Sequence, residues 1–97
     1  MTKLYQRELE PLGLTYPQYI VLLILWEHAP CSVSTIGDRA ELASNTLTPL
    51  LKRLESMGFV KRHRDEKDER VVNIVLTKDG KALKKECVDI PKRLMAR

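Results

Sequence analysis

A change of hydrophobic period beside Gly58 constrains the fold of this chain most strongly. Before the glycine, apolar side chains recur at the spacing of one helical face: Leu47, Leu50, Leu51, Leu54 and Met57. After it, residues 59–64 read as a strand that leads to a charged tip at 65–69, and in the return strand at 70–76 Val72, Ile74 and Leu76 alternate onto one face. Because glycine is the preferred residue just past a helix end, the pattern predicts a helix that leads directly into a β-hairpin.

The segments before and after this unit read as further helices. Thr15 and Gln18 form a capping box ahead of a helix that runs to about His28 and is apolar on nearly all sides, which predicts a central buried helix. Upstream, residues 2–10 read as the end of a helix broken at Pro11. Downstream, Thr77 is expected to cap a last helix with an apolar stripe of Leu83, Cys87, Ile90 and Leu94.

Between these parts, the sequence predicts a short strand at Cys31–Val33, a helix capped by Ser34 and a tight turn at Ala43–Asn45. Pro49 fits the next helix without losing a hydrogen bond only if that helix begins near Thr46. Two short helices joined by a tight turn and followed by a hairpin describe a winged helix-turn-helix. The expected class is therefore mainly α with a small β-hairpin (α+β), in one domain over residues 1–97.

Composition narrows the function classes. The chain carries a net charge of +4, and residues 44–97 hold fourteen Lys and Arg against eight Asp and Glu, which suits a nucleic-acid partner or simply a solvated lysine-rich surface. The apolar run at 19–26 is too short to span a membrane, and the amino terminus has no signal-peptide pattern. Two cysteines without a CxxC pair indicate a reducing, cytoplasmic setting.

No pattern of catalytic or metal-binding residues appears. His28, Cys31, His63 and Cys87 lack the spacing of zinc ligands, and each cysteine reads as a small buried or surface residue. There is no nucleophile–base motif, phosphate loop or paired catalytic carboxylates. We therefore expect no enzyme activity, no cofactor and no metal.

The helix at 44–57 has the layout of a DNA recognition helix. With its leucines buried, the opposite face carries Ser44, Thr48 and Lys52, with Asn45, Pro49 and Arg53 beside them. Small hydroxyl and amide groups can read base edges in the major groove, and the following cations can neutralise phosphates. The alternative is that the hydroxyl side chains merely cap an ordinary surface helix.

The hairpin favours the DNA-binding interpretation. Asp68 and Arg70 are two residues apart, so on one strand they share a face, where the carboxylate can hold the guanidinium for insertion into a narrow minor groove. The alternative is a solvated turn of mixed charge. The predicted DNA-binding residues are Ser34, Ser44, Asn45, Thr46, Thr48, Pro49, Lys52, Arg53, Arg64, Lys67, Asp68 and Arg70.

Three segments resemble the MarR family of winged-helix regulators, and within it the branch that senses organic hydroperoxides. They are Leu14–Tyr19, Thr46–Glu55 and Asp68–Arg70 with Leu76-Thr77, and the resemblance runs from about Met1 to Pro91. It implies a homodimeric repressor on a pseudo-palindromic operator, with Arg70 in the minor groove and Asp68 positioning it. It also implies that residues 1–13 end one dimerisation helix, 15–77 form the DNA-binding core and 78–97 begin a second dimerisation helix.

In the hydroperoxide-sensing branch two tyrosines hold a reactive cysteine, and Tyr5 and Tyr16 match their places. That cysteine would lie upstream of Met1, so the chain resembles a truncated regulator, with a peroxide or small molecule as its implied effector. The branch also has Asp-Ser-Gly where this chain has Ala43-Ser44-Asn45, which bears on operator preference. The alternative function, from a different class, is a protein-interaction module on a winged-helix scaffold.

Overall fold

The computed structural model describes residues 7–87, and its element order agrees with the sequence analysis. After a helical turn at residues 7–9, the elements are η1 (Glu10–Leu12), α2 (Tyr16–His28), β1 (Cys31–Ser32), α3 (Val33–Ala40), α4 (Ser44–Ser56), β2 (Val60–Arg64), β3 (Val72–Leu76) and α5 (Lys78–Cys87). The mainly α class with a winged helix-turn-helix is confirmed.

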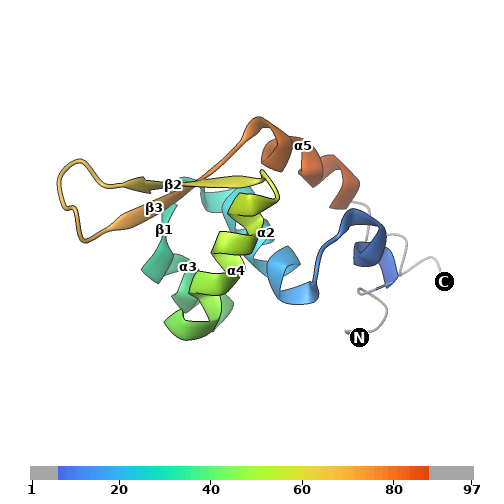
Figure 1. Cartoon of the computed structure of the whole chain (residues 1–97), viewed down its shortest axis with the longest axis horizontal. Coiled ribbons are helices and arrows are strands. Elements are labelled where there is room, and N and C mark those ends of the chain that lie inside the picture. The colour runs from blue at the N-terminus through green and yellow to red at the C-terminus, as the bar shows by residue number, and fades with distance from the viewer. Residues whose placement is uncertain (1–6, 88–97) are drawn as a thin grey trace.

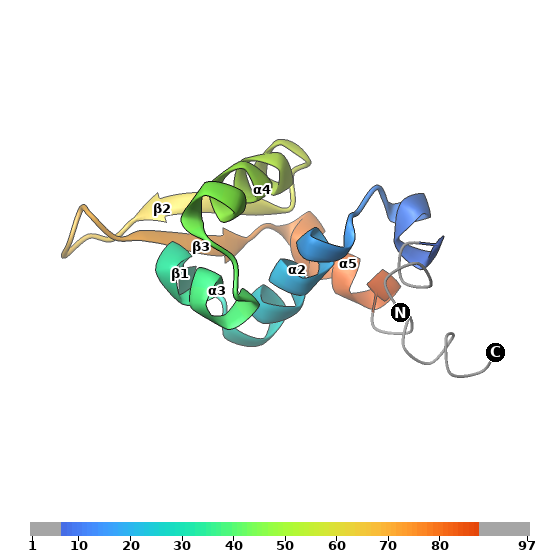
Figure 2. The ribbon, with the colours of Figure 1, turned by 90° about the horizontal axis from the view of Figure 1, so that it is seen from below.

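The sheet has three strands, because the short strand predicted at Cys31–Val33 is present as β1 and pairs with the hairpin. Its order is β1-β3-β2 and all pairs are antiparallel, with Cys31 opposite Ile74 and Val60 opposite Leu76. The β2–β3 hairpin projects beyond the helices, whereas η1 and the end of α5 lie at the opposite end of the molecule (Figure 1 and Figure 2). The hairpin is therefore the wing of the fold.

Helix α2 begins where the sequence predicts and forms the centre of the core. The Thr15 hydroxyl accepts from the Gln18 N–H at 3.4 Å, and the Gln18 side chain accepts from the Thr15 N–H at 3.0 Å, so the capping box is confirmed. Val21, Leu22 and Leu25 of this helix are fully buried. Each residue buried in this way contributes about 1.5–3 kcal/mol to stability.

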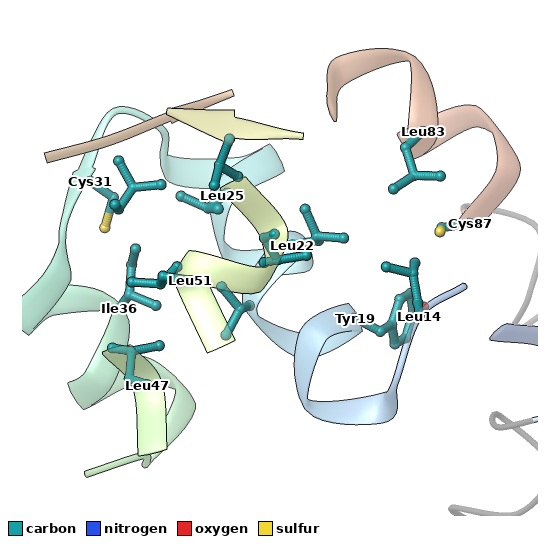
Figure 3. Packing of buried hydrophobic residues seen from close by; sticks show 14 of the residues in the cluster. Leu14, Tyr19, Leu22, Leu25, Cys31, Ile36, Leu47, Leu51, Leu83 and Cys87 are labelled. Carbon is teal, nitrogen blue, oxygen red and sulfur yellow. The ribbon is translucent and has the colours of Figure 1, made fainter. Parts of the chain in front are cut away.

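One hydrophobic cluster joins all the helices to the sheet. Figure 3 shows Leu22 between two groups of core side chains. One group contains Leu14, Tyr19, Leu83 and Cys87, and the other contains Leu25, Cys31, Ile36, Leu47 and Leu51. Because α4 enters the core through Leu47 and Leu51, the leucine ridge fixes the rotation of α4 about its own axis.

The cap of α3 was predicted wrongly. Ser32, not Ser34, is the cap: its hydroxyl accepts from the Thr35 N–H at 3.2 Å, and its backbone is extended with φ −70° and ψ 153°. Val33 therefore belongs to the helix and not to the strand. Both serines suit a cap, and the pairing of Ser32 with Asn73 on β3 places the end of the strand there.

Other boundaries shift by one or two residues. The strands begin at Val60 and Val72 rather than at Phe59 and Arg70. Thr77 caps α5 as predicted, since its hydroxyl accepts from the Gly80 N–H at 3.0 Å. The expectations for residues 1–6, including Tyr5, and for Ile90, Pro91 and Leu94 lie outside the described residues.

Candidate nucleic-acid interface

The leucine ridge of α4 faces the core as expected. Leu47, Leu51 and Leu54 are buried, and Leu50 and Met57 pack against the same cluster while partly exposed. The rest of the helix surface is therefore turned to solvent. The exposed α4 residues of the predicted interface are Ser44, Asn45, Thr46, Thr48, Pro49, Lys52 and Arg53.

The start of α4 differs from the expected turn. Ala43 is the cap residue, with extended backbone, and its carbonyl accepts from the N–H groups of Thr46 at 3.0 Å and Leu47 at 2.9 Å. The left-handed residue of the connection is Glu41 (φ 56°), which ends α3. Ser44 and Asn45 therefore belong to the first helical turn rather than to a turn between helices.

Pro49 lies in the second turn of α4, because the helix begins at Ser44 and not near Thr46. Proline has no N–H, so residue 49 donates no backbone hydrogen bond to the Asn45 carbonyl. The missing bond faces solvent, since both residues are exposed. This position therefore loses one helical hydrogen bond, as the sequence analysis anticipated for a start at Ser44.

At the wing tip, Arg70 is hydrogen-bonded to Asp68. Asp68 Oδ1 accepts from the Arg70 backbone N–H at 3.0 Å and from its Nε at 3.1 Å, and Oδ2 accepts from Nη2 at 3.4 Å. The hydrogen bonds that Asp68 accepts, chiefly from the Arg70 side chain and secondly from the Arg70 backbone N–H, lower the pKa of the Asp68 carboxyl below its ordinary 3.8. The pairing predicted from the spacing is confirmed.

The geometric reason given for that pairing was wrong, because Asp68 and Arg70 lie in a turn and not on a strand. The Val71 N–H donates to the Asp68 carbonyl at 2.9 Å, which closes a turn before β3 begins. A carboxylate that accepts from the N–H two residues later is a common arrangement in such turns. The turn, rather than strand alternation, brings the two side chains together.

Two further cations of the predicted interface lie around this turn. Arg64 Nη1 donates to the Glu69 carbonyl at 2.8 Å across the base of the tip. Lys67 is exposed on the tip itself. Arg64 therefore braces the loop that presents Arg70, and its remaining guanidinium donors still face solvent.

One charged contact between the wing and α4 involves a residue outside the predicted set. Arg62 on β2 forms an ion pair with Glu55 of α4, with Arg62 Nε 3.2 Å from the carboxylate. Strand alternation puts Arg62 on the same face as the buried Val60, over α4, and this was the available signal. The pair joins the wing to the recognition helix.

A shallow hollow lies between α3, α4 and the wing, with a volume of about 560 Å³. The polar residues that line it are Ser32, Ser34, Asp38, Ser44, Thr48, Arg62 and Arg70. The fold thus brings together hydroxyl groups from two helices and two arginines from the wing. Ser34, in the first turn of α3, is one of the residues that line the hollow.

The expected sensor residues and the thiols lie elsewhere. Tyr16 is partly buried at the start of α2, with its ring centroid 6.4 Å from that of Tyr19. Cys31 and Cys87 are both buried, and burial raises the pKa of the Cys31 thiol while the charge of Arg39 lowers it to a smaller extent. A raised pKa lowers the thiolate fraction of Cys31, and the thiolate is the reactive form of a cysteine.

The described part of the chain offers neither a metal centre nor a membrane span. Over residues 7–87, no three His, Cys, Asp or Glu side chains gather as ligands for an ion. No helix within that range has the length and apolar character needed to cross a bilayer.

Comparisons with known proteins agree with this geometry. The family described as "Transcriptional regulator SarA/Rot" matches residues 3–87. The organic hydroperoxide resistance transcriptional regulator of Bacillus subtilis is 53% identical over 91 residues, which cover 94% of this chain and 62% of that protein. The HTH-type regulator SarZ of Staphylococcus aureus is 44% identical over 88 residues, covering 91% of this chain and 60% of SarZ. The chain thus spans about three fifths of the length of these relatives.

Solved structures give the same result. Overoxidized AbfR of Staphylococcus epidermidis, bound to DNA, superposes with a TM-score of 0.90 at 42% identity, covering 96% of this chain and 68% of that one. A MarR transcriptional regulator from Methanosarcina mazei superposes with a TM-score of 0.85 at 26% identity, over 98% and 71% of the two chains. The resemblance to MarR regulators, and to their hydroperoxide branch, is confirmed.

Proposed function

The chain belongs to the SarA/Rot family of transcriptional regulators, and from this premise we propose that it binds duplex DNA at specific sequences and acts as a repressor of the MarR type. The observation that carries the proposal is that Ser44 and Thr48 of the polar face of α4 line the same hollow as Arg70, which Asp68 holds. A helix fits the major groove, and an arginine on a wing suits the narrow minor groove beside it.

Each side chain has a role that follows from its place. Ser44, Asn45 and Thr48 in the first turns of α4 read base edges, because they carry short donors and acceptors. Lys52 and Arg53 follow one turn later and neutralise phosphates. Ser34 on α3 donates its hydroxyl to the phosphate backbone, since the first helix of this motif crosses that backbone.

We also propose that the protein acts as a homodimer on a pseudo-palindromic operator. One recognition helix reads only a few base pairs, and two copies related by a two-fold axis read two half-sites one helical turn apart. The resemblance to MarR regulators assigns dimerisation to residues 1–13 and 78–97. An effector of the organic hydroperoxide class is proposed from the name of the Bacillus subtilis relative.

Cys31 and Cys87 are poor candidates for a peroxide-reactive thiol, because both are buried. We therefore expect that neither thiol carries a peroxide response, so that replacing both by serine leaves any release of DNA as it is in the unchanged chain. Release of DNA on addition of cumene hydroperoxide, compared between the unchanged chain and the Cys31→Ser, Cys87→Ser double variant, measures this. Loss of the response in the folded double variant would instead assign the chemistry to one of these two thiols.

The proposed function is tested by selecting duplexes from a random pool with the purified chain. We expect an enriched motif, bound far more tightly than random duplex, with an affinity that falls steeply as salt increases. Arg70→Ala should weaken binding to the selected duplex by ~1–3 kcal/mol. A chain that enriches no motif, or that forms a stable complex with another protein and ignores DNA, would favour the protein-interaction module instead.

A further inference from the structure

The end of the recognition helix and the start of α5 meet at Gly58. Helix α4 closes with the Gly58 N–H donating to the Glu55 carbonyl at 3.0 Å and the Phe59 N–H donating to the Leu54 carbonyl at 3.1 Å. Gly58 has φ +86°, the left-handed conformation that this type of helix end requires. The Gly58 carbonyl is thereby turned away from the helix.

The side chain of Thr77 is hydrogen-bonded to the Gly58 carbonyl. The Thr77 hydroxyl donates to the Gly58 oxygen at 2.6 Å and, at the same time, accepts from the Gly80 N–H at 3.0 Å as the cap of α5. The Thr77 N–H also donates to the Phe59 carbonyl at 3.1 Å. A single hydroxyl group therefore links the last residue of the α4 ending to the first turn of α5.

Two further contacts, both made by Gly80, hold the start of α5 in position. A Cβ on Gly80 would collide with the Phe59 carbonyl oxygen, so only glycine lets α5 approach this closely. From the other side, the Trp26 indole N–H donates to the Gly80 carbonyl at 2.9 Å and ties the same turn to α2. The start of α5 is held against both helices.

We propose that Thr77 is a positioning residue for DNA recognition: its hydroxyl fixes the angle between α4 and α5, so that the tilt of α5 sets how α4 enters the groove. This rests on the proposed function, since it concerns the pose of the helix that reads DNA. Close hydrogen bonds and backbone packing at one point transmit a rotation of one helix to the other. Thr77 itself is not among the residues that line the hollow between α3, α4 and the wing.

The two roles of the hydroxyl can be separated by substitution. Thr77→Asp keeps an acceptor for the Gly80 N–H, and aspartate is as good a helix cap as threonine, but it cannot donate to the Gly58 carbonyl and repels it. Thr77→Ser keeps both the acceptor and the donor. Ser56→Ala is the matched control, because the Ser56 hydroxyl donates to the Arg53 carbonyl at 2.8 Å within the same end of α4 and does not reach α5.

The first measurement needs no DNA. Residual dipolar couplings of the amides of α4 and α5 in the full chain give the angle between the two helices. We expect that angle to change, or the α4 couplings to shrink, in Thr77→Asp and to stay as in the unchanged chain in Thr77→Ser and Ser56→Ala. If Thr77→Asp does not fold, Thr77→Val, which removes the hydroxyl at nearly the same volume, takes its place.

The second measurement is affinity for the selected duplex relative to random duplex. Thr77→Asp should lower this ratio by about 3- to 30-fold, the range typical of coupling between sites, whereas Thr77→Ser and Ser56→Ala should leave it unchanged. An unchanged helix angle in Thr77→Asp, an unchanged ratio, or an equal loss in Thr77→Ser would each overturn the positioning role. If the unchanged chain selects no duplex while Thr77→Asp still alters the helix angle, the DNA-binding proposal fails and the link between the helices stands.

Discussion

Arg70 is bound by Asp68 and yet remains almost fully open to solvent. The Nε–Oδ1 distance is 3.1 Å, while 91% of the Arg70 side chain is exposed, against 39% for Asp68. An exposed arginine usually samples many rotamers, and ordering such a side chain costs up to about 2 kcal/mol. Asp68 therefore presents the guanidinium to a partner in a restricted set of orientations, ahead of binding.

The Asp68–Arg70 pair predicts a pH dependence of the wing. Because the pKa of Asp68 is lowered in the folded chain, the pair stabilises the wing above the ordinary value of 3.8, and this contribution is lost as the pH falls through the lowered pKa. A titration of the Asp68 side-chain carboxyl carbon by NMR should show a midpoint below 3.8. In Arg70→Gln the midpoint should move up toward 3.8, and identical midpoints in both chains would contradict the pairing in solution.

Two charge removals at the wing tip should have different effects on DNA binding. Asp68→Asn deletes a negative charge near DNA, yet we expect it to weaken specific binding by roughly fivefold, because Arg70 loses its orienting partner. Glu66→Gln deletes an exposed charge from the same tip and should leave binding unchanged or strengthen it. Anisotropy titrations at one salt concentration compare them, and stronger binding by Asp68→Asn would show that only net charge matters.

Glu55→Gln should release Arg62 for contact with a phosphate. The Arg62 and Glu55 side chains are 42% and 36% exposed, so their ion pair contributes little to stability. We expect tighter binding to random duplex, with the slope of log affinity against log salt steeper by about 0.9. Glu86→Gln, an exposed acid on α5, is the control. Equal slopes in all three chains would mean that Arg62 does not reach the DNA.

Two glycines should differ in the free energy of unfolding that an added methyl costs. In Gly80→Ala the new Cβ collides with the Phe59 carbonyl oxygen, so backbone must move, at a cost of about 3 kcal/mol. In Gly58→Ala nothing lies within 4 Å of the Cβ, and the left-handed backbone alone costs about 1 kcal/mol. Urea unfolding measures both, and a smaller loss for Gly80→Ala would contradict the close approach of α5.

The sequence was sufficient wherever local chemistry decides the structure. The capping box of Thr15 and Gln18, the leucine ridge of α4 and the cap at Thr77 depend on residues within a few positions of one another, and all three are present. The polar face of α4 follows from burial of the ridge. The outward placement of Ser44, Thr48 and Lys52 could therefore be predicted from hydrophobic spacing alone.

Contacts between distant residues could not be predicted in this way. Ser32 is the cap of α3 because β3, which comes much later in the chain, pairs with β1 and ends it there. The Arg62–Glu55 pair and the Thr77–Gly58 bond depend on how β2 and α5 return to α4. Such contacts can be identified only from the three-dimensional arrangement, because the spacing of apolar residues in the sequence shows only which face of a helix or strand is buried.

The central claim is that the polar face of α4 and the wing arginine contact one duplex together. Cross-saturation transfer from an unlabelled selected duplex to the amides of the perdeuterated chain measures direct contact. We predict that amides of residues 44–48 and 67–70 lose intensity in the same complex, while those of α2 and α5 do not. Loss of intensity along α2 or α5, with residues 44–48 unaffected, would contradict this claim.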